Sequence, residues 1–323
     1  YFYFRDKFRG HRFDGIAGAI QKLVEELLNE QLTSIIKKTK RSKISYGGGT
    51  AMNVKANGLL ASREDVNDFF VPISPGDESN PIGACYYATE KYFLENNIDP
   101  NQIPPLDNIY LGPEYSDIEV KKFVSNIDLD NKINVYENID ASFISKKLYE
   151  GNVIGRFVGR SEFGQRSLGN RSIIASTTEN NIVDKINSKI KYRDFWMPFC
   201  PTILDKYKNE YIHNPKNLKS EYMTLSFSLN EKYEEYFKGG VHHADKTVRP
   251  QILENNKNNE YYKLIDSFEK FSGLGSIINT SFNLHGEPVV GTLDDSMRTF
   301  NKSDLDGLVL NNIYLEKNET FKK

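Results

Sequence analysis

The order of apolar and polar residues predicts helices and strands that alternate along the whole chain. From Phe13 to Lys38, apolar residues recur every three or four positions, which predicts one long amphipathic helix. The same period predicts shorter helices at 81–96, 116–124, 140–149, 180–190, 261–271 and 292–301. Short β-prone runs predict strands at 44–46, 69–73, 133–136, 153–158, 173–176, 222–229, 247–253, 276–280 and 307–314. This alternation predicts an α/β fold with mixed α+β layers.

A proline-rich segment divides this pattern into two predicted domains. Residues 97–115 contain four prolines and few periodic apolar residues, which is typical of a linker. A chain of 323 residues is long enough for about two domains, each with its own core. We therefore predict one domain at 1–110 and a second at 111–323.

Charge and composition exclude several classes of protein. Hydrophobic content of 38% and charged content of 27% are typical of a globular protein rather than a disordered one. A net formal charge of −2 provides no bulk attraction to polyanions, so we expect no membrane partner and disfavour nucleic acid. No apolar run approaches the ~18–20 residues that span a bilayer. The two cysteines, Cys85 and Cys200, lack metal-ligand spacing and suit a reducing compartment, so we expect a cytoplasmic protein.

The most informative stretch is residues 159–172, which we call the arginine loop. It lies between two predicted strands and holds Arg160, Arg166 and Arg171, three glycines and one acid, Glu162. Glycine lets backbone N–H groups approach an anion, and guanidinium groups bind phosphate or carboxylate oxygens in pairs. A solvated hairpin tip is the alternative, but such tips rarely combine this many arginines with glycines. We predict an anion site, most simply for phosphate.

Two other polar groups in the second predicted domain leave alternatives open. Lys191 and Arg193 follow the predicted helix at 180–190, where they either complement the helix dipole or bind the same anion. His242 and His243 precede Asp245, and this combination of side chains suggests a zinc site. Neighbouring strand residues rarely point the same way, so zinc is disfavoured there.

Glycine-rich and acidic turns follow the first two predicted strands. Residues 47–50 are three glycines and a threonine, and such a turn offers free backbone N–H groups at the start of a helix, as nucleotide-binding loops do. A tight turn without a ligand also uses glycines. Asp77 follows the next strand in a Pro-Gly turn, where it is placed equally well to bind a metal ion or to cap the following helix.

Several ordered motifs together resemble one protein family, the O-carbamoyltransferases of the nodulation and antibiotic-tailoring kind. The motifs of the second half are Arg160-Ser-Glu-Phe-Gly-Gln-Arg-Ser-Leu-Gly-Asn-Arg-Ser, Lys191-Tyr-Arg with Met197-Pro-Phe-Cys-Pro, His243-Ala-Asp-Lys-Thr-Val-Arg-Pro-Gln, and Asn279-Thr-Ser-Phe-Asn-Leu-His-Gly-Glu-Pro. Those of the first half are Gly47-Gly-Gly-Thr-Ala-Met-Asn-Val-Lys-Ala-Asn-Gly and Ser74-Pro-Gly-Asp-Glu-Ser-Asn-Pro-Ile-Gly-Ala. The resemblance covers nearly the whole chain.

The resemblance implies a two-site enzyme. Residues 1–110 would be the second lobe of a Kae1-like domain, which is a partial ATPase lobe of the actin/hexokinase type. Residues 111–323 would be a YrdC-like domain with a twisted open sheet, joining carbamoyl phosphate to ATP to give carbamoyladenylate. The Kae1-like site would then pass the carbamoyl group to an acceptor hydroxyl beside a bound iron. The implied ligands are ATP with Mg²⁺, carbamoyl phosphate and an acceptor whose identity the sequence leaves open.

The resemblance also assigns roles to individual residues. Catalytic roles are implied for Arg166, Lys191, Arg249 and Asn279. Substrate or nucleotide contacts are implied for Arg160, Glu162, Arg171, Arg193, Thr247, Ser281, Asn283, Gly48, Gly49 and Asn53. Glu162 is expected to position an arginine rather than to act as a base, and Asp77 is the implied metal ligand.

One departure from the family pattern affects the first site. A full-length member has a first lobe with an Asp-Gly-His-type phosphate loop and a His-x-x-x-His metal pair, and this sequence has neither. Iron is therefore expected only if a missing lobe is supplied, either because the chain is a fragment or because a separate polypeptide provides it. Two alternative functions are threonylcarbamoyl-adenylate synthesis for tRNA modification and a non-enzymatic nucleotide-binding module.

Overall fold

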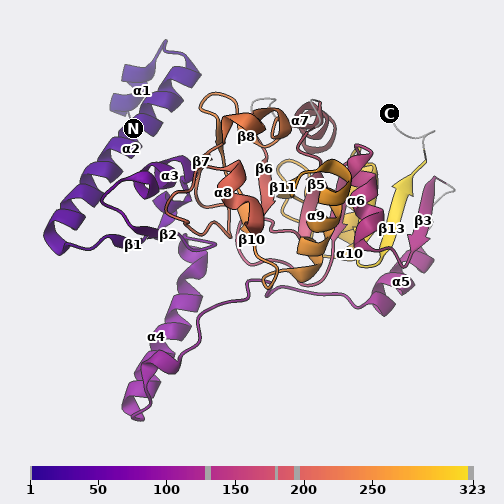
Figure 1. Cartoon of the computed structure of the whole chain (residues 1–323), viewed down its shortest axis with the longest axis horizontal. Helices are drawn as coiled ribbons and strands as arrows, with labels where there is room; N and C mark the ends of the chain where they lie inside the picture. The colour runs from indigo at the N-terminus through magenta and orange to yellow at the C-terminus, as the bar shows by residue number, and fades with distance from the viewer. Residues whose placement is uncertain (1, 128–131, 179–180, 193–196, 319–323) are drawn as a thin grey trace.

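The N-terminal third of the protein is mostly helical. The structure is a computed structural model that describes residues 2–127, 132–178, 181–192 and 197–318 (Figure 1). Two parallel strands, Lys43–Ser45 (β1) and Asp68–Phe70 (β2), form the small sheet of this part. Its helices are α1 (Phe2–Phe8), α2 (Phe13–Thr39), α3 (Val54–Ser62) and α4 (Asn80–Glu95), with short 3₁₀ turns at Gly49–Met52, Asp77–Ser79 and Pro100–Gln102.

An eight-stranded sheet organises the rest of the chain. Its strand order is β10-β6-β11-β5-β4-β12-β13-β3, with two parallel pairs (β10–β6 and β12–β4) among antiparallel ones. Its strands are β3 (Ile133–Glu137), β4 (Ile154–Phe157), β5 (Arg171–Ala175), β6 (Cys200–Leu204), β10 (Gln251–Leu253), β11 (Ser276–Ser281), β12 (Gly307–Leu310) and β13 (Ile313–Lys317). This mixed sheet with helices around it confirms the predicted mixed α/β class.

Helices cover both faces of the large sheet. On one face lie α6 (Ala141–Tyr149) and α9 (Asn259–Ser272), and α9 buries Tyr261, Leu264, Ile265 and Phe268, spaced as one helical stripe. On the other face lie α5 (Asp117–Asn126), α7 (Ile182–Asp184) with a π-helical turn at Lys185–Lys191, and α10 (Leu293–Lys302). Alternate residues of β4 enter the two cores, because successive strand side chains point to opposite faces.

A third core joins the N-terminal part to the second half of the chain. The strands β7 (Phe227–Ser228), β9 (Thr247–Val248) and β8 (Val241–His242) form a small antiparallel sheet. Beside it lie the short helix α8 (Lys208–Tyr211) and 3₁₀ turns at Asp205–Tyr207 and Glu231–Tyr236. Buried residues of this region pack with Leu60 of α3 and Phe69 of β2 in one hydrophobic cluster. Lys216 strengthens the junction by donating to the carbonyls of Ala61 and Val66.

Four predicted elements differ from the structure. The predicted strand at 222–229 is reduced to β7, and the one at 247–253 is split between two sheets at Pro250, which has no N–H for a ladder. The predicted strand at 307–314 is a hairpin, β12 and β13, turning at Asn311 with a φ of 48°. The helix at 180–190 is a short α-turn followed by a π-helix, and the sequence pattern missed β6.

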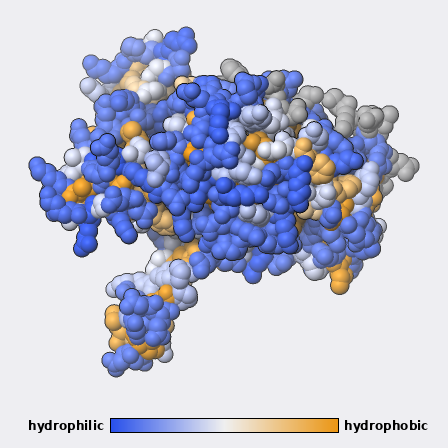
Figure 2. All heavy atoms as spheres, in the orientation of Figure 1, coloured by the Kyte–Doolittle hydropathy of each residue, from blue (hydrophilic) through white to orange (hydrophobic). Residues whose placement is uncertain are grey.

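Two N-terminal helices leave apolar surface uncovered. In Figure 1, α4 projects from the body of the molecule, and Figure 2 shows hydrophobic residues gathered on that projection. None of the residues of α4 is buried, and Leu32 is the one buried residue of α2. Among the described residues, no helix is both long and apolar enough to cross a membrane.

Candidate functional site

The arginine loop and three other segments meet at one end of the eight-stranded sheet. The loop leaves β4 and enters β5, which are antiparallel neighbours. The end of β11 lies beside the start of β5, because Ser281 is paired with Ser172. The start of β6 lies beside β11, because Cys200 is paired with Asn279. Arg249 precedes β10, which runs parallel to β6, so it reaches the same end of the sheet.

Two of the predicted catalytic arginines lie close together here. The guanidinium of Arg249 donates from Nε and Nη2 to Sγ of the buried Cys200, at 2.8 and 2.6 Å. Burial, followed by the neighbouring charge of Arg249, lowers the pKa of Arg166 to about 10. No hydrogen bond or ion pair joins Arg166 to the described part of the chain. Like charges held this close favour the binding of an anion.

Lys191 adds a third cation at the end of β11. Its ammonium donates to Asn283 Oδ1 at 2.6 Å, to Ser281 Oγ at 3.2 Å and to the Ser281 carbonyl. Ser281 Oγ in turn donates to Asn283 Oδ1 at 2.6 Å, and Asn283 Nδ2 donates to the Glu287 carbonyl. The structure therefore brings Lys191, Ser281 and Asn283 together, and their role in binding stays a prediction.

Glu162 shapes the arginine loop through the backbone. Its Oε1 accepts hydrogen bonds from the backbone N–H groups of Leu168 and Asn170, both at 2.7 Å, and of Arg171 at 3.3 Å. A carboxylate that accepts several backbone N–H groups is fixed in place and closes the loop on itself. Glu162 was expected to position an arginine, and what it positions is the backbone on both sides of Gly169.

Arg171 differs from the expectation of a ligand contact. It is 1% exposed, and its Nη1 and Nη2 donate to four carbonyls, those of Val158, Gly159, Asn170 and Pro113, at 2.9–3.1 Å. Its guanidinium lies 3.7 Å from the centre of the Phe157 ring. The side chain is thus committed to the fold because β5 begins at this residue and turns it inward, which the loop composition did not reveal.

Asn279 belongs to a buried network that includes a residue the sequence analysis did not single out, Gln251. Asn279 Nδ2 donates to Gln251 Oε1 at 3.1 Å and to Thr202 Oγ1 at 3.3 Å, while Asn279 Oδ1 is buried without a partner in the described chain. Gln251 Nε2 donates to the Leu168 carbonyl at 3.1 Å. Gln251 is the last residue of the motif that begins at His243, and that position was the available signal.

Arg160 lies on the rim of the same region. It donates to the carbonyls of Leu111 and Gly112 at 3.0 and 3.1 Å and stays exposed. A cavity of about 530 Å³ opens beside it, with Asn170 and Asn258 also in its wall. Arg193, another predicted contact, lies outside the described residues.

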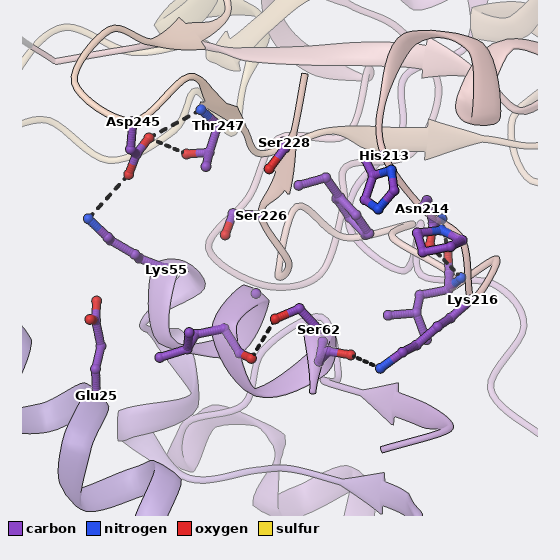
Figure 3. A pocket seen from close by; sticks show the side chains of 16 residues that line it. Glu25, Lys55, Ser62, His213, Asn214, Lys216, Ser226, Ser228, Asp245 and Thr247 are labelled. Carbon is purple, nitrogen blue, oxygen red and sulfur yellow. Dashed lines mark hydrogen bonds and ion pairs between the residues drawn. The ribbon is translucent and has the colours of Figure 1, made fainter. Parts of the chain in front are cut away.

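Thr247 lies in a different cavity from the arginines. This cavity of about 340 Å³ is lined on one side by residues of α2 and α3 and on the other by residues within 213–228 and 245–247 (Figure 3). Asp245 accepts from Thr247 Oγ1 at 2.7 Å and pairs with Lys55 at 3.2 Å. Burial raises the pKa of Asp245, but bonds from Thr247, His242 and Lys55 outweigh it and lower the pKa to about 2. The contacts of Thr247 thus hold a carboxylate.

Of the predicted nucleotide contacts in the N-terminal part, Gly48 and Gly49 are open to solvent, whereas Asn53 is bound to other parts of the fold. Gly48 and Gly49 are exposed, and Gly48 has a φ of 97°, a conformation that favours glycine. Asn53 caps α3 by accepting from the Ala56 N–H at 3.1 Å, and its amide exchanges hydrogen bonds with Gln21 of α2. Asn53 therefore has structural partners, whereas the two glycines are open to a ligand.

Asp77 lies on an exposed turn that touches the arginine loop. Glu78, the next residue, accepts a hydrogen bond from Gln165. In the part of the chain that the structure describes, no three His, Cys, Asp or Glu side chains gather in a metal-binding group. These residues alone do not fit an iron site, so we derive no step through iron.

Two family models match the chain on either side of the predicted linker. The model described as Carbamoyltransferase C-terminus matches residues 145–317, more than half of the chain. The model described as Carbamoyltransferase N-terminus matches residues 4–86. The chain belongs to the carbamoyltransferase family. The resemblance seen in the motifs is confirmed.

Relatives of this carbamoyltransferase chain include proteins of three kinds. An uncharacterized protein of Methanocaldococcus jannaschii is 34% identical, over 97% of this chain and 57% of its own length. Nodulation protein NolNO of Sinorhizobium fredii is 31% identical, over 94% of this chain and 44% of its own. The 3'-hydroxymethylcephem-O-carbamoyltransferase of Streptomyces clavuligerus is 24% identical, over 94% of this chain and 55% of its own length. The chain thus spans about half the length of the curated relatives it matches.

One solved structure that the carbamoyltransferase chain resembles distantly is full-length HypF in a phosphate- and nucleotide-bound form. The two are 16% identical, with a TM-score of 0.39, over 54% of this chain and 25% of HypF. A likeness of this size carries no argument about function.

Proposed function

We propose that the C-terminal part of this carbamoyltransferase chain forms carbamoyladenylate from carbamoyl phosphate and ATP. Water releases the phosphate of the donor, and the resulting carbamate oxygen attacks the α-phosphorus of ATP. The new C–O–P linkage forms as the bond to the β-phosphate breaks, and pyrophosphate leaves. The observation that carries this proposal is the Arg166–Arg249 pair, two adjacent cations at the sheet end where Lys191 also lies.

Charge neutralisation is the chemistry these residues offer. Both substrates are polyanions, so bringing them together requires fixed positive charge and alignment more than a strong base. Guanidinium groups bind phosphate oxygens in pairs and keep their charge at neutral pH, even where the pKa of Arg166 falls to about 10. Mg²⁺ enters the proposal with the ATP phosphates, because Mg²⁺ sites consist largely of substrate phosphates, water and few carboxylates.

The room beside the arginine loop supports the proposal. The cavity of about 530 Å³ next to Arg160 is lined by asparagines, including Asn108, Asn170 and Asn258, and by charged residues of both signs. Arg166, Arg249 and Lys191 do not line it, so in this proposal it would hold the base or ribose and not the phosphates. Cavities of roughly 300–1,000 Å³ hold small ligands. Amide groups both donate and accept hydrogen bonds, which suits the base or ribose of a nucleotide.

The test is carbamoyl-phosphate-dependent release of pyrophosphate from ATP by this chain, compared with an Arg166→Ala variant. We expect turnover in the wild type and a loss of at least about 100-fold in the variant, the size typical for removing one charge-stabilising donor. Arg41→Ala is the control, since it removes an exposed arginine outside the arginine loop and should keep most activity. ATP binding without turnover in the wild type would contradict the adenylation reaction.

We further propose that transfer to the acceptor hydroxyl requires a second lobe, supplied by an adjoining segment or by a separate chain. The support is the uncovered apolar surface of α2 and α4, which includes Leu23 at 51% and Leu94 at 60% exposure. The relatives are also about twice as long as the matched region. Asp77 would then be one metal ligand among others that the lobe brings.

A further inference from the structure

Two adjacent arginines repel each other in the absence of a ligand, so the fold has to hold them together. Gln251, two residues after Arg249, bonds at 3.1 Å to the carbonyl of Leu168, two residues after Arg166, so the two arginines lie near each other. The Arg249 charge accordingly contributes to lowering the pKa of Arg166. Arg166 has no hydrogen-bond partner in the described chain that would fix its own side chain. Its position therefore depends on the backbone of the arginine loop, and in particular on the residues that anchor that backbone.

Leu168, two residues after Arg166, is the anchor point of the loop. Its backbone N–H donates to Glu162 Oε1 at 2.7 Å, and its carbonyl accepts from Gln251 Nε2 at 3.1 Å and from the Tyr110 hydroxyl at 3.0 Å. Both backbone polar groups of this buried residue are thus bound. Glu162 belongs to the loop itself and Tyr110 to the predicted linker, so the bond that ties Leu168 to the large sheet is the one from Gln251. Arg156 of β4 ties the loop to the same sheet at the Gly169 carbonyl.

Gln251 ties the strand that follows Arg249 to the loop that carries Arg166. It is the first residue of β10, two residues after Arg249, and it is 2% exposed. Its Oε1 accepts from Thr202 Oγ1 at 2.8 Å and from Asn279 Nδ2 at 3.1 Å, which fixes the amide orientation. With Oε1 held in this way, the Nε2 group of the amide points to the Leu168 carbonyl and donates to it.

We propose that Gln251 is a positioning residue that holds Arg166 and Arg249 at a fixed separation, so that the pair binds one phosphate-containing anion. The inference rests on the proposed function, because it assigns Gln251 to the same anion site. Gln251 does not touch the anion. Gln251 positions Arg166 through its bond to the Leu168 carbonyl, and it positions Arg249 through the backbone of their shared segment at the start of β10.

The test measures the affinity of the full chain for inorganic pyrophosphate by calorimetry, in wild type, Gln251→Glu, Gln251→Leu and Thr202→Val. A carboxylate keeps the acceptor for Thr202 and Asn279 but cannot donate to the Leu168 carbonyl, and leucine loses both functions. We expect about 10-fold weaker binding in both Gln251 variants, as for the loss of one well-placed hydrogen bond. Thr202→Val keeps the Asn279 bond to Gln251 Oε1, which still orients the amide towards Leu168, and should change affinity by less than about 2-fold.

A pH series separates positioning from simple destabilisation. In Gln251→Glu, burial raises the pKa of the new carboxyl, and its protonated form again donates to the Leu168 carbonyl. Affinity relative to wild type should therefore recover between about pH 8 and about pH 6, whereas Gln251→Leu should not recover. The titratable and charged groups around this site are common to both proteins, so their effects cancel in the comparison. They are Glu162, Tyr110, Tyr261, Arg156 and Arg249 and, in the small cavity that Gln251 lines, Asp107, Glu221, Tyr222 and Lys257.

Each result decides the proposal. Wild-type affinity in Gln251→Glu would overturn the positioning role and leave the anion site standing. If the wild type itself binds neither pyrophosphate nor carbamoyl phosphate, the proposed function fails. Limited trypsin cleavage after Arg166 then serves as the readout of loop position. Faster cleavage there in Gln251→Glu, with other sites unchanged, would support the anchor, and unchanged cleavage would overturn it.

Discussion

Two arginines of the same loop should respond in opposite ways to replacement by methionine. Arg171 is bound by four backbone carbonyls, whereas Arg166 has no hydrogen bond to the described chain. Arg171→Met should therefore lower the free energy of unfolding, and Arg166→Met should leave it unchanged or raise it. Arg41→Met, at an exposed arginine of the N-terminal part, is the control.

The magnitude for Arg171 follows from which carbonyls lose their partner. The Asn170 carbonyl also accepts from the Val158 N–H, and the Pro113 carbonyl also accepts from the Ser161 N–H. The carbonyls of Val158 and Gly159 have no second donor of this kind in the described chain. Each orphaned carbonyl costs about 1–3 kcal/mol, and removing a buried charge returns part of that cost. We expect a net loss of about 2–4 kcal/mol.

The assay is urea unfolding followed by circular dichroism, with and without pyrophosphate. An unchanged slope with a lower midpoint would identify a loss of stability in Arg171→Met. Pyrophosphate at 100 times its Kd should stabilise the wild type and Arg41→Met by about 2.7 kcal/mol and should not stabilise Arg166→Met. Wild-type stability in Arg171→Met, or a large loss in Arg166→Met, would refute the division into a structural and a ligand-binding arginine.

Two further predictions concern other parts of the fold. Asp245→Asn should remove a contribution to stability that is present above about pH 4 and is lost as the pH falls towards about 2, because the folded-state pKa of Asp245 is lowered to about 2. The measurement is the unfolding free energy of both proteins from pH 6 downward, and the difference between them should shrink in that window. A constant difference would show that the Lys55 and Thr247 contacts do not stabilise the carboxylate. Gly169→Ala should lower the free energy of unfolding by about 2–4 kcal/mol in thermal or urea unfolding, because the φ of Gly169 is 119° and an added Cβ would lie 2.4 Å from the buried Tyr261 ring. Gly273→Ala is the control, with a φ of 73° and open space around the added Cβ, and should cost only about 1 kcal/mol. Equal losses of stability in the two variants would show that backbone strain alone decides the cost.

Several features of the site were predictable from local sequence. The arginine loop, with three arginines and three glycines between two β-prone runs, was correctly placed between strands, since β4 and β5 flank it. The motifs were specific enough to indicate the carbamoyltransferase family, because a glycine or an arginine at a set spacing encodes a loop shape and a charge. The class of fold followed from the alternating periods of the apolar residues.

The sequence by itself determined which elements form and which charges the chain carries near them. It did not determine which arginine is free, because that depends on where Arg171 enters β5 and meets the carbonyls of a neighbouring segment. Nor did it show that Gln251 ties the strand of Arg249 to the loop of Arg166, since these residues are about 80 positions apart and meet only through the strand order β10-β6-β11-β5-β4. Burial and pairing between distant segments are properties of the tertiary structure, and they decide whether a cation supports the fold or binds a ligand.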